Sequence, residues 1–163
     1  MLSEMDEMFR EINAVTQSPL LQVLISDARK VDGTTPYSLM LISEALQEKH
    51  HHQLALKCCE FAGRFETWNK TSTPSSQCCN YIARSRCHEG LGNEAEREIW
   101  LRRAYELADG EPLPMSTAWR IANELQKCLF SLQQIVEANV WRATADTLMN
   151  NMIERAARRR KEK

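Results

Sequence analysis

The chain has 163 residues, and its 21 Lys and Arg against 22 Asp and Glu give a formal net charge of -1. This length predicts one domain, and the near-balance of charge argues against a wholly basic nucleic-acid binder or an acidic solvating chain. Hydrophobic residues make up 43%, and there are only 5 Gly and 5 Pro. That composition indicates a folded chain with few turns and disfavours a β-sandwich or barrel.

The first half of the chain is predicted to form four helices. Apolar residues recur three or four apart over residues 2–15, which predicts an amphipathic helix. Ser18-Pro19 and Thr35-Pro36 each place a capping residue before a proline, the usual start of a helix. A fourth helix is expected over residues 54–65, with Trp68 at its end.

The second half is predicted to form four more helices. The stretch NKTSTPSS at residues 69–76 predicts a loop. A fifth helix is expected over residues 77–89 and a sixth over residues 93–110, with glycines between them. No strong helix breaker follows Ser116, and a single helix of that length would exceed ~60 Å. We therefore expect a break near Asn139 that separates a seventh helix from an eighth.

Eight helices in this order pair into four antiparallel hairpins whose starts lie about 33, 40 and 41 residues apart, a period typical of helical-repeat arrays. The sequence therefore predicts an all-α fold of antiparallel helical hairpins stacked as a short α-solenoid. A compact helical bundle is the alternative. We expect a single domain over residues 1–157 and a basic C-terminal tail over residues 158–163.

The segment from about residue 77 to residue 112 resembles a tetratricopeptide repeat. It has an early aromatic residue, a small residue at the helix contact, a turn glycine, a large–small–leucine series in the second helix and a closing proline. These are Tyr81, Ser85, Gly92, Leu101, Ala104, Leu107 and Pro112. Arg84, His88 and Arg97 depart from the family pattern. The resemblance implies a superhelical scaffold whose first-helix faces bind a partner peptide or domain.

The six cysteines are Cys58, Cys59, Cys78, Cys79, Cys87 and Cys128. No export signal or membrane-spanning stretch is apparent, so we expect the chain to be cytoplasmic or nuclear, where disulfides are rare. Zinc bound by Cys58-Cys59, Cys78-Cys79, Cys87-His88 and the histidines at 50–52 is a second interpretation. However, the cysteine pairs are adjacent, whereas structural zinc sites usually space their ligands two to four residues apart. We favour cysteines as small core residues, and we expect no metal and no cofactor.

Catalytic motifs are scarce in this sequence. It contains no glycine-rich phosphate loop and no HExxH motif. Its histidines are the run at 50–52 and His88, so a Ser–His or Cys–His pair has few candidate bases. Cys87 precedes His88, but neighbouring side chains on a helix diverge by about 100°. We predict that the chain has no catalytic residues and is not an enzyme.

Polar residues on the expected fifth and seventh helices predict a binding surface. In a solenoid these would be the first helices of successive pairs, and their polar faces could share one groove. The candidate partner-binding residues are Arg86, Glu89, Arg120, Asn123 and Lys127. Long cationic side chains there would suit an acidic peptide or a terminal carboxylate. A solvated helix face is the alternative.

The last nine residues form a basic tail with six basic residues and one acidic residue. Its candidate binding residues are Arg155, Arg158, Arg159, Arg160 and Lys161. The tail predicts a nuclear-localisation signal or a nucleic-acid patch. The alternative is a helix C-terminus whose cations are favoured by the negative end of the helix dipole.

These observations predict a non-catalytic protein–protein interaction module, either an adaptor or a subunit of a larger complex. It would bind a partner peptide or domain in a helical groove. The alternative function is a nucleic-acid-associated helical protein that uses the basic tail. No membrane partner is expected. A homo-oligomer is a further possibility, because the apolar stretch Leu20–Val31 suits stacking on another copy of the chain.

Overall fold

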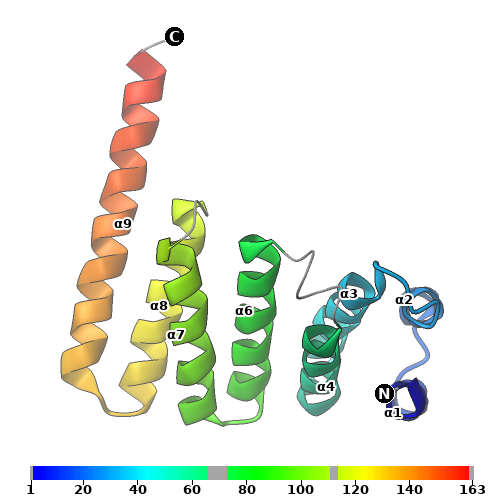
Figure 1. Cartoon of the computed structure of the whole chain (residues 1–163). Helices are drawn as coiled ribbons and strands as arrows, with labels where there is room; N and C mark the ends of the chain where they lie inside the picture. The colour runs from blue at the N-terminus through cyan, green and yellow to red at the C-terminus, as the bar shows by residue number, and fades with distance from the viewer. Residues whose placement is uncertain (1, 66–72, 111–113, 162–163) are drawn as a thin grey trace. The chain divides into compact units, whose positions relative to one another are not determined.

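The computed structural model describes residues 2–65, 73–110 and 114–161 (Figure 1). Within these ranges the regular elements are eight α-helices and no strands. The helices are α1 (Leu2–Val15), α2 (Pro19–Ala28), α3 (Thr35–Glu48), α4 (His52–Arg64), α6 (Pro74–Gly90), α7 (Glu94–Gly110), α8 (Met115–Ser131) and α9 (Ile135–Lys161). Consecutive helices pack against each other, as in α3–α4 and α8–α9, which confirms the predicted all-α fold of antiparallel hairpins.

The chain divides into two compact units. Unit 1 comprises residues 1–73 and 86–93, and unit 2 comprises residues 74–85 and 94–163. The division passes through α6, whose last turn belongs with unit 1. The predicted domain boundary stays a prediction, but α9 continues through Lys161, so most of the predicted basic tail is helical.

Unit 1 is built around an apolar core. Helix α1 contributes Met5, Met8, Phe9 and Ile12, each no more than 2% exposed. Their spacing of three or four residues places them on one face of the helix, as the sequence pattern predicts. That face packs on α4, while α3 packs on both α2 and α4. Cys87, near the end of α6, is fully buried in the same core.

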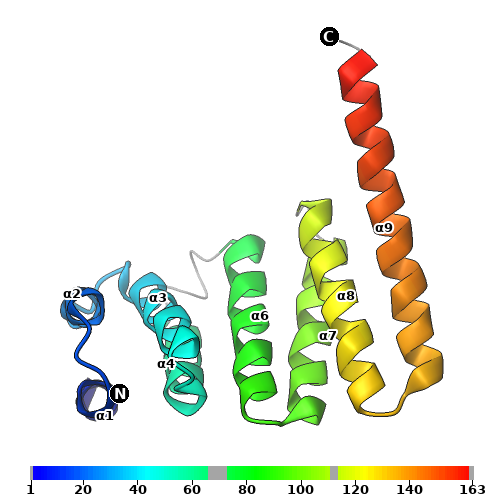
Figure 2. The same ribbon diagram turned by 180° about the vertical axis from the view of Figure 1, so that it is seen from behind.

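Unit 2 has a smaller apolar core drawn from the start of α6 and from α7 and α8. Its buried members are Cys78, Ile82, Leu101, Ala104, Ala108, Ile121, Leu125 and Cys128. Helix α9 lies along α8 in both views, and its C-terminal end continues past the end of α8 (Figures 1 and 2). Two aromatic pairs complete the packing, Tyr81 with Trp100 and Tyr105 with Trp141.

Proline marks the start of two helices as expected. Helix α2 begins at Pro19 with Ser18 at its N-cap, and α3 begins at Thr35 directly before Pro36. Helix α6 begins at Pro74, three residues ahead of the predicted start, because Pro is well tolerated in the first turn of a helix. Trp68 and Pro112 lie outside the described residues.

The predicted break near Asn139 is wrong. Helix α8 ends at Ser131 and α9 begins at Ile135, so Asn139 lies inside α9. The chain reverses at Gln133, which has a left-handed φ of 59°. The Gln134 amide donates to the Leu129 carbonyl at 2.8 Å, closing the end of the helix in a Schellman motif.

Two other helices end in the same closure. The His51 amide donates to the Leu46 carbonyl at 2.9 Å after α3, with His50 at a φ of 61°. After α6 the Asn93 amide donates to the His88 carbonyl at 2.9 Å, with Gly92 at a φ of 72°. Glycine is the usual residue at this position because it has no Cβ. Of these three turns, only the one at Gly92 can therefore be predicted from the sequence.

Candidate functional site: the groove between α1 and α4

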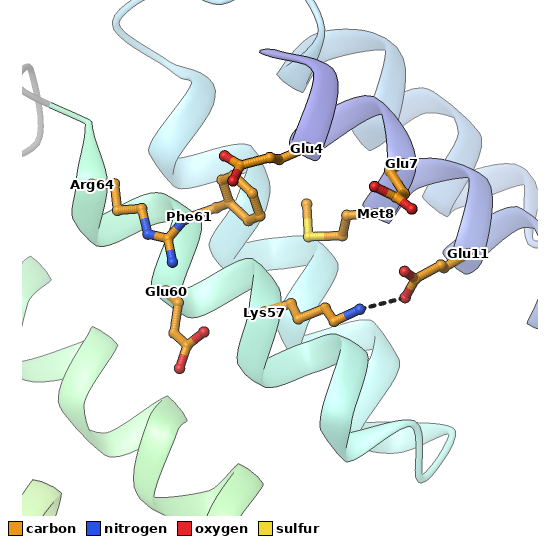
Figure 3. A pocket seen from close by; sticks show the side chains of 8 residues that line it. All are labelled: Glu4, Glu7, Met8, Glu11, Lys57, Glu60, Phe61 and Arg64. Carbon is orange, nitrogen blue, oxygen red and sulfur yellow. Dashed lines mark hydrogen bonds and ion pairs between the residues drawn. The ribbon is translucent and has the colours of Figure 1, made fainter. Parts of the chain in front are cut away.

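A groove of about 270 Å³ opens between α1 and α4, both in unit 1 (Figure 3). It is lined by Glu4, Glu7, Met8, Glu11, Lys57, Glu60, Phe61 and Arg64. The charged residues of α1 follow one another at steps of three and four, and those of α4 do the same. This spacing places each set on one face of its helix. The two helices therefore present two charged rows to the same groove.

The floor of the groove is apolar. Met8 is 2% exposed and Phe61 is 7% exposed, and both lie between the two charged rows in Figure 3. The Arg64 guanidinium lies 5.0 Å from the centre of the Phe61 ring, a cation–π contact. The groove therefore offers an apolar stem a narrow contact surface, with charged groups on either side for a polar head.

The rims of the groove carry excess negative charge, since four glutamates face two cations. Lys57 Nζ lies 2.6 Å from Glu11 Oε2 and ties α4 to α1. Both side chains are partly exposed, so this ion pair contributes only about 0–1 kcal/mol to stability. Glu7 is exposed and pairs with no cation among the described residues. The uncompensated carboxylate favours a cationic ligand over an anionic one.

The predicted cationic groove divides between the two units. Arg86 and Glu89 are exposed at the end of α6 in unit 1, whereas Arg120, Asn123 and Lys127 lie on α8 in unit 2. A groove shared by all five residues therefore stays a prediction. Within unit 2, Lys127 Nζ forms an ion pair with Glu124 Oε1 at 2.9 Å.

Arg120 borders a separate shallow depression on α8. It shares this hollow of about 290 Å³ with Ser116, Thr117 and Trp119, all from the first two turns of the same helix. Arg120 is exposed and Asn123 is half-buried. A depression lined by a single helix offers a ligand less enclosure than the two-helix groove of unit 1.

The predicted residues of the basic tail lie together on the last turns of α9. All five are exposed, namely Arg155, Arg158, Arg159, Arg160 and Lys161. Arg158 lies 3.7 Å from Glu154, an ion pair within the helix. The structure thus gathers these cations on one continuous helix end.

None of the six cysteines forms a disulfide, and five of them are buried, which confirms a place in the core for those five. Cys79 is exposed, so the prediction is wrong for that residue. Burial raises the pKa of the Cys78 thiol to about 11 and that of the Cys128 thiol to about 12. Such thiols stay protonated at neutral pH and are poor nucleophiles. Within the described ranges, no three His, Cys, Asp or Glu side chains are arranged to hold a metal ion.

Sequence reasoning missed the groove of unit 1. The row Glu4, Glu7 and Glu11 is visible in the sequence as the polar side of an amphipathic helix. The row on α4 has the same spacing, but it follows about 50 residues later, and no local pattern pairs α1 with α4. A search of the sequence for charged rows beside apolar helix faces would have found the row on α1 and the row on α4. It would not have shown that the two helices pack together.

The comparisons give no relative from which a function could be carried over. No family model, no curated protein and no solved structure matches this chain. Over the described residues, no helix combines the length and the apolar character needed to cross a membrane. The functional interpretation therefore rests on the geometry and charge of the chain's own surfaces.

Proposed function

We propose that this chain is a non-catalytic protein–protein interaction module, an adaptor or a subunit of a larger complex. The observation that carries the proposal is the groove between α1 and α4, with its apolar floor and charged rims. Helical grooves of this kind bind a partner segment by accepting apolar side chains on the floor and charged ones at the rims. The resemblance of residues 77–112 to a tetratricopeptide repeat supports the same class of function.

The size and exposure of the groove favour recognition over catalysis. Its volume of about 270 Å³ is below the ~300–1,000 Å³ usual for small-molecule sites. Its glutamates are exposed or half-buried, so water competes for them, whereas acid–base catalysis depends on groups shielded and tuned by burial. A side chain such as Lys or Arg, with an apolar stem and a cationic head, fits both the floor and the rims. We therefore propose a basic partner segment.

The test is a crosslinked pull-down from cell extract with four baits, each shown to be folded by circular dichroism. They are the intact chain, the groove variant Glu4→Lys/Glu7→Lys, the control Glu44→Lys/Glu48→Lys, and Arg86→Glu/Arg120→Glu/Lys127→Glu. The control changes the charge equally at exposed positions of α3. We expect a partner that is kept by the intact chain, the control and the triple variant but lost by the groove variant. Loss with the triple variant alone would move the site to the predicted cationic residues.

A nucleic-acid-associated function is the second candidate, and the exposed cations at the end of α9 favour it. Binding through phosphates weakens steeply as salt rises, because bound counterions are released. Deleting residues 155–163 should then abolish binding to a random-sequence DNA duplex, while Glu4→Lys/Glu7→Lys should leave it intact. Binding that survives the deletion would exclude the tail as the nucleic-acid site.

A further inference from the structure

The C-terminal end of α9 has no packing partner among the described residues. Helix α9 has 27 residues and α8 has 17, so α9 extends about 15 Å beyond the helix that supports it. Residues 153–161 are all exposed, including Ile153 at 59%. Most helices in proteins are stabilised by packing of one face rather than by intrinsic propensity. An exposed end of this length is therefore suited to docking.

The charges of this helix end are complementary to the groove of unit 1. The end of α9 carries Arg155, with Arg158 three residues and Arg159 four residues further along, so the three lie near one face of the helix. Helix α1 carries Glu4, Glu7 and Glu11 along the groove, at successive steps of three and four residues. Because an α-helix rises 1.5 Å per residue, the three arginines span about 6 Å along α9 and the three glutamates about 10.5 Å along α1, so the cations fit within the length of the carboxylate row. One helix end laid along α1 can thus bring several guanidinium groups to carboxylates at once.

We propose that the basic end of α9 docks in the groove between α1 and α4 of a second copy of this chain. The inference rests on the proposed function, because it uses the same groove and names the basic segment that fills it. Arginine stems cover the apolar floor formed by Met8 and Phe61, and their guanidinium groups reach the rim carboxylates. The occupant is a second copy because the chain itself supplies the cationic helix that the groove requires.

This contact joins two different surfaces, so each bound copy still offers one free groove and one free helix end. Such heterologous contacts produce rings when the rotation closes and open chains when it does not. We expect the average mass in solution to rise with protein concentration. We also expect the association to weaken with salt, because the contact is mostly ionic and exposed.

The test is sedimentation velocity of the full chain across a wide concentration range, at about 0.05 M and at about 0.5 M salt. Three variants are compared with the natural chain: the groove variant Glu4→Lys/Glu7→Lys, the helix-end variant Arg155→Glu/Arg159→Glu, and the control Glu44→Lys/Glu48→Lys. Each of the first two should weaken association at least about tenfold, because attraction becomes repulsion. The control should associate like the natural chain, and circular dichroism should show all variants folded.

The decisive sample is an equimolar mixture of the groove variant and the helix-end variant. Each alone carries like charges on both surfaces, whereas the mixture again offers opposite charges, so association should return in the mixture only. A natural chain that stays monomeric in both salts overturns the inference, as does association that neither variant weakens. In that case a partner captured in the pull-down would still support the proposed function. A monomer whose helix end binds a random-sequence DNA duplex would assign that end to nucleic acid and also overturn the inference.

Discussion

The two units of the chain are stabilised in different ways. Unit 1 buries a continuous apolar core to which α1, α2, α3 and α4 all contribute. Unit 2 has a smaller apolar core, and ion pairs link α7 with both α8 and α9. Unit 1 also has an ion pair between helices, Lys57 with Glu11, but its side chains are partly exposed, whereas Arg97 of unit 2 is buried. The difference teaches that a hairpin array can rely mainly on apolar packing in one part and add buried charged contacts in another.

The ion pairs of unit 2 centre on Arg97, which is only 3% exposed. Its guanidinium lies 3.1 Å from Glu94 on its own helix and 2.7 Å from Glu124 on α8. A buried guanidinium is tolerated when carboxylates satisfy its donors. The two carboxylates explain how a long cation occupies this buried position.

A second link joins α7 to α9. Arg102 lies 2.7 Å from Glu98 and 2.6 Å from Glu137. Burial alone would lower the pKa of Arg102, but hydrogen bonds to Glu137 and Glu98 outweigh it and raise the pKa. The guanidinium thus remains charged and bridges two helices.

The largest expected effect is in the apolar core of unit 1. Phe9 is fully buried on α1, and replacing it with Ala removes an aromatic ring and leaves a cavity. We expect Phe9→Ala to lower the free energy of unfolding by about 3–5 kcal/mol, measured by urea denaturation. Val136→Ala is the control, because Val136 is 83% exposed and the change should cost less than about 0.5 kcal/mol. Similar costs for both variants would contradict an apolar core at α1.

The next effect concerns the buried cation of unit 2. Arg97→Leu leaves Glu94 and Glu124 without their shared partner, and we expect a loss of about 2–4 kcal/mol in the free energy of unfolding. Glu124 keeps its ion pair with Lys127, but its contact with Arg97 is lost. Adding Glu124→Leu removes this carboxylate, so the double variant should recover part of that loss. A double variant less stable than the single one would mean that Arg97 acts through packing of its stem rather than through its charge.

Most of the fold is readable from the sequence, because helix starts and apolar spacing are local signals. The pair Ser18-Pro19 predicts the start of α2. The apolar stripe from Met5 to Ile12 predicts the buried face of α1. The turn at Gln133 was missed because a left-handed residue other than glycine carries no compositional signal. The groove was missed because it depends on which helices meet, and a pairing across about 50 residues is not encoded in any short pattern.

A smaller effect tests the turn that the sequence did not reveal. A residue with a Cβ in the left-handed region costs about 1–2 kcal/mol, and glycine avoids this cost but gains freedom in the unfolded chain. At φ 59°, Gln133→Gly should therefore raise the free energy of unfolding by about 0.5–1 kcal/mol. Gln134→Gly is the matched control and should lower it, since it loosens the chain and removes the hydrogen bond that Gln134 Nε2 donates to Glu98 Oε2. Destabilisation by both variants would show that the Gln133 side chain contributes more than its backbone strain costs.

The smallest effect is the contribution of Glu124 to acid stability. Burial tends to raise the pKa of Glu124, but Lys127 and Arg97 outweigh it, so the pKa lies below the ordinary value of 4.5. A carboxylate whose pKa is lowered by folding binds protons more tightly in the unfolded chain. Its stabilising contribution is therefore complete above about pH 4.5 and is lost as the pH falls through the folded pKa.

Glu124→Gln removes this titration and should flatten the fall in unfolding free energy as the pH drops below the ordinary pKa of 4.5. Glu44→Gln, at an exposed site on α3, should leave the fall unchanged and serves as the control. An equally steep fall in Glu124→Gln would mean that acid destabilises the chain through other carboxylates. The ion pairs of unit 2 would then position the helices without determining how the free energy of unfolding depends on pH. With the expected flattening, the charged contacts distinguish unit 2 from unit 1 in stability as well as in structure.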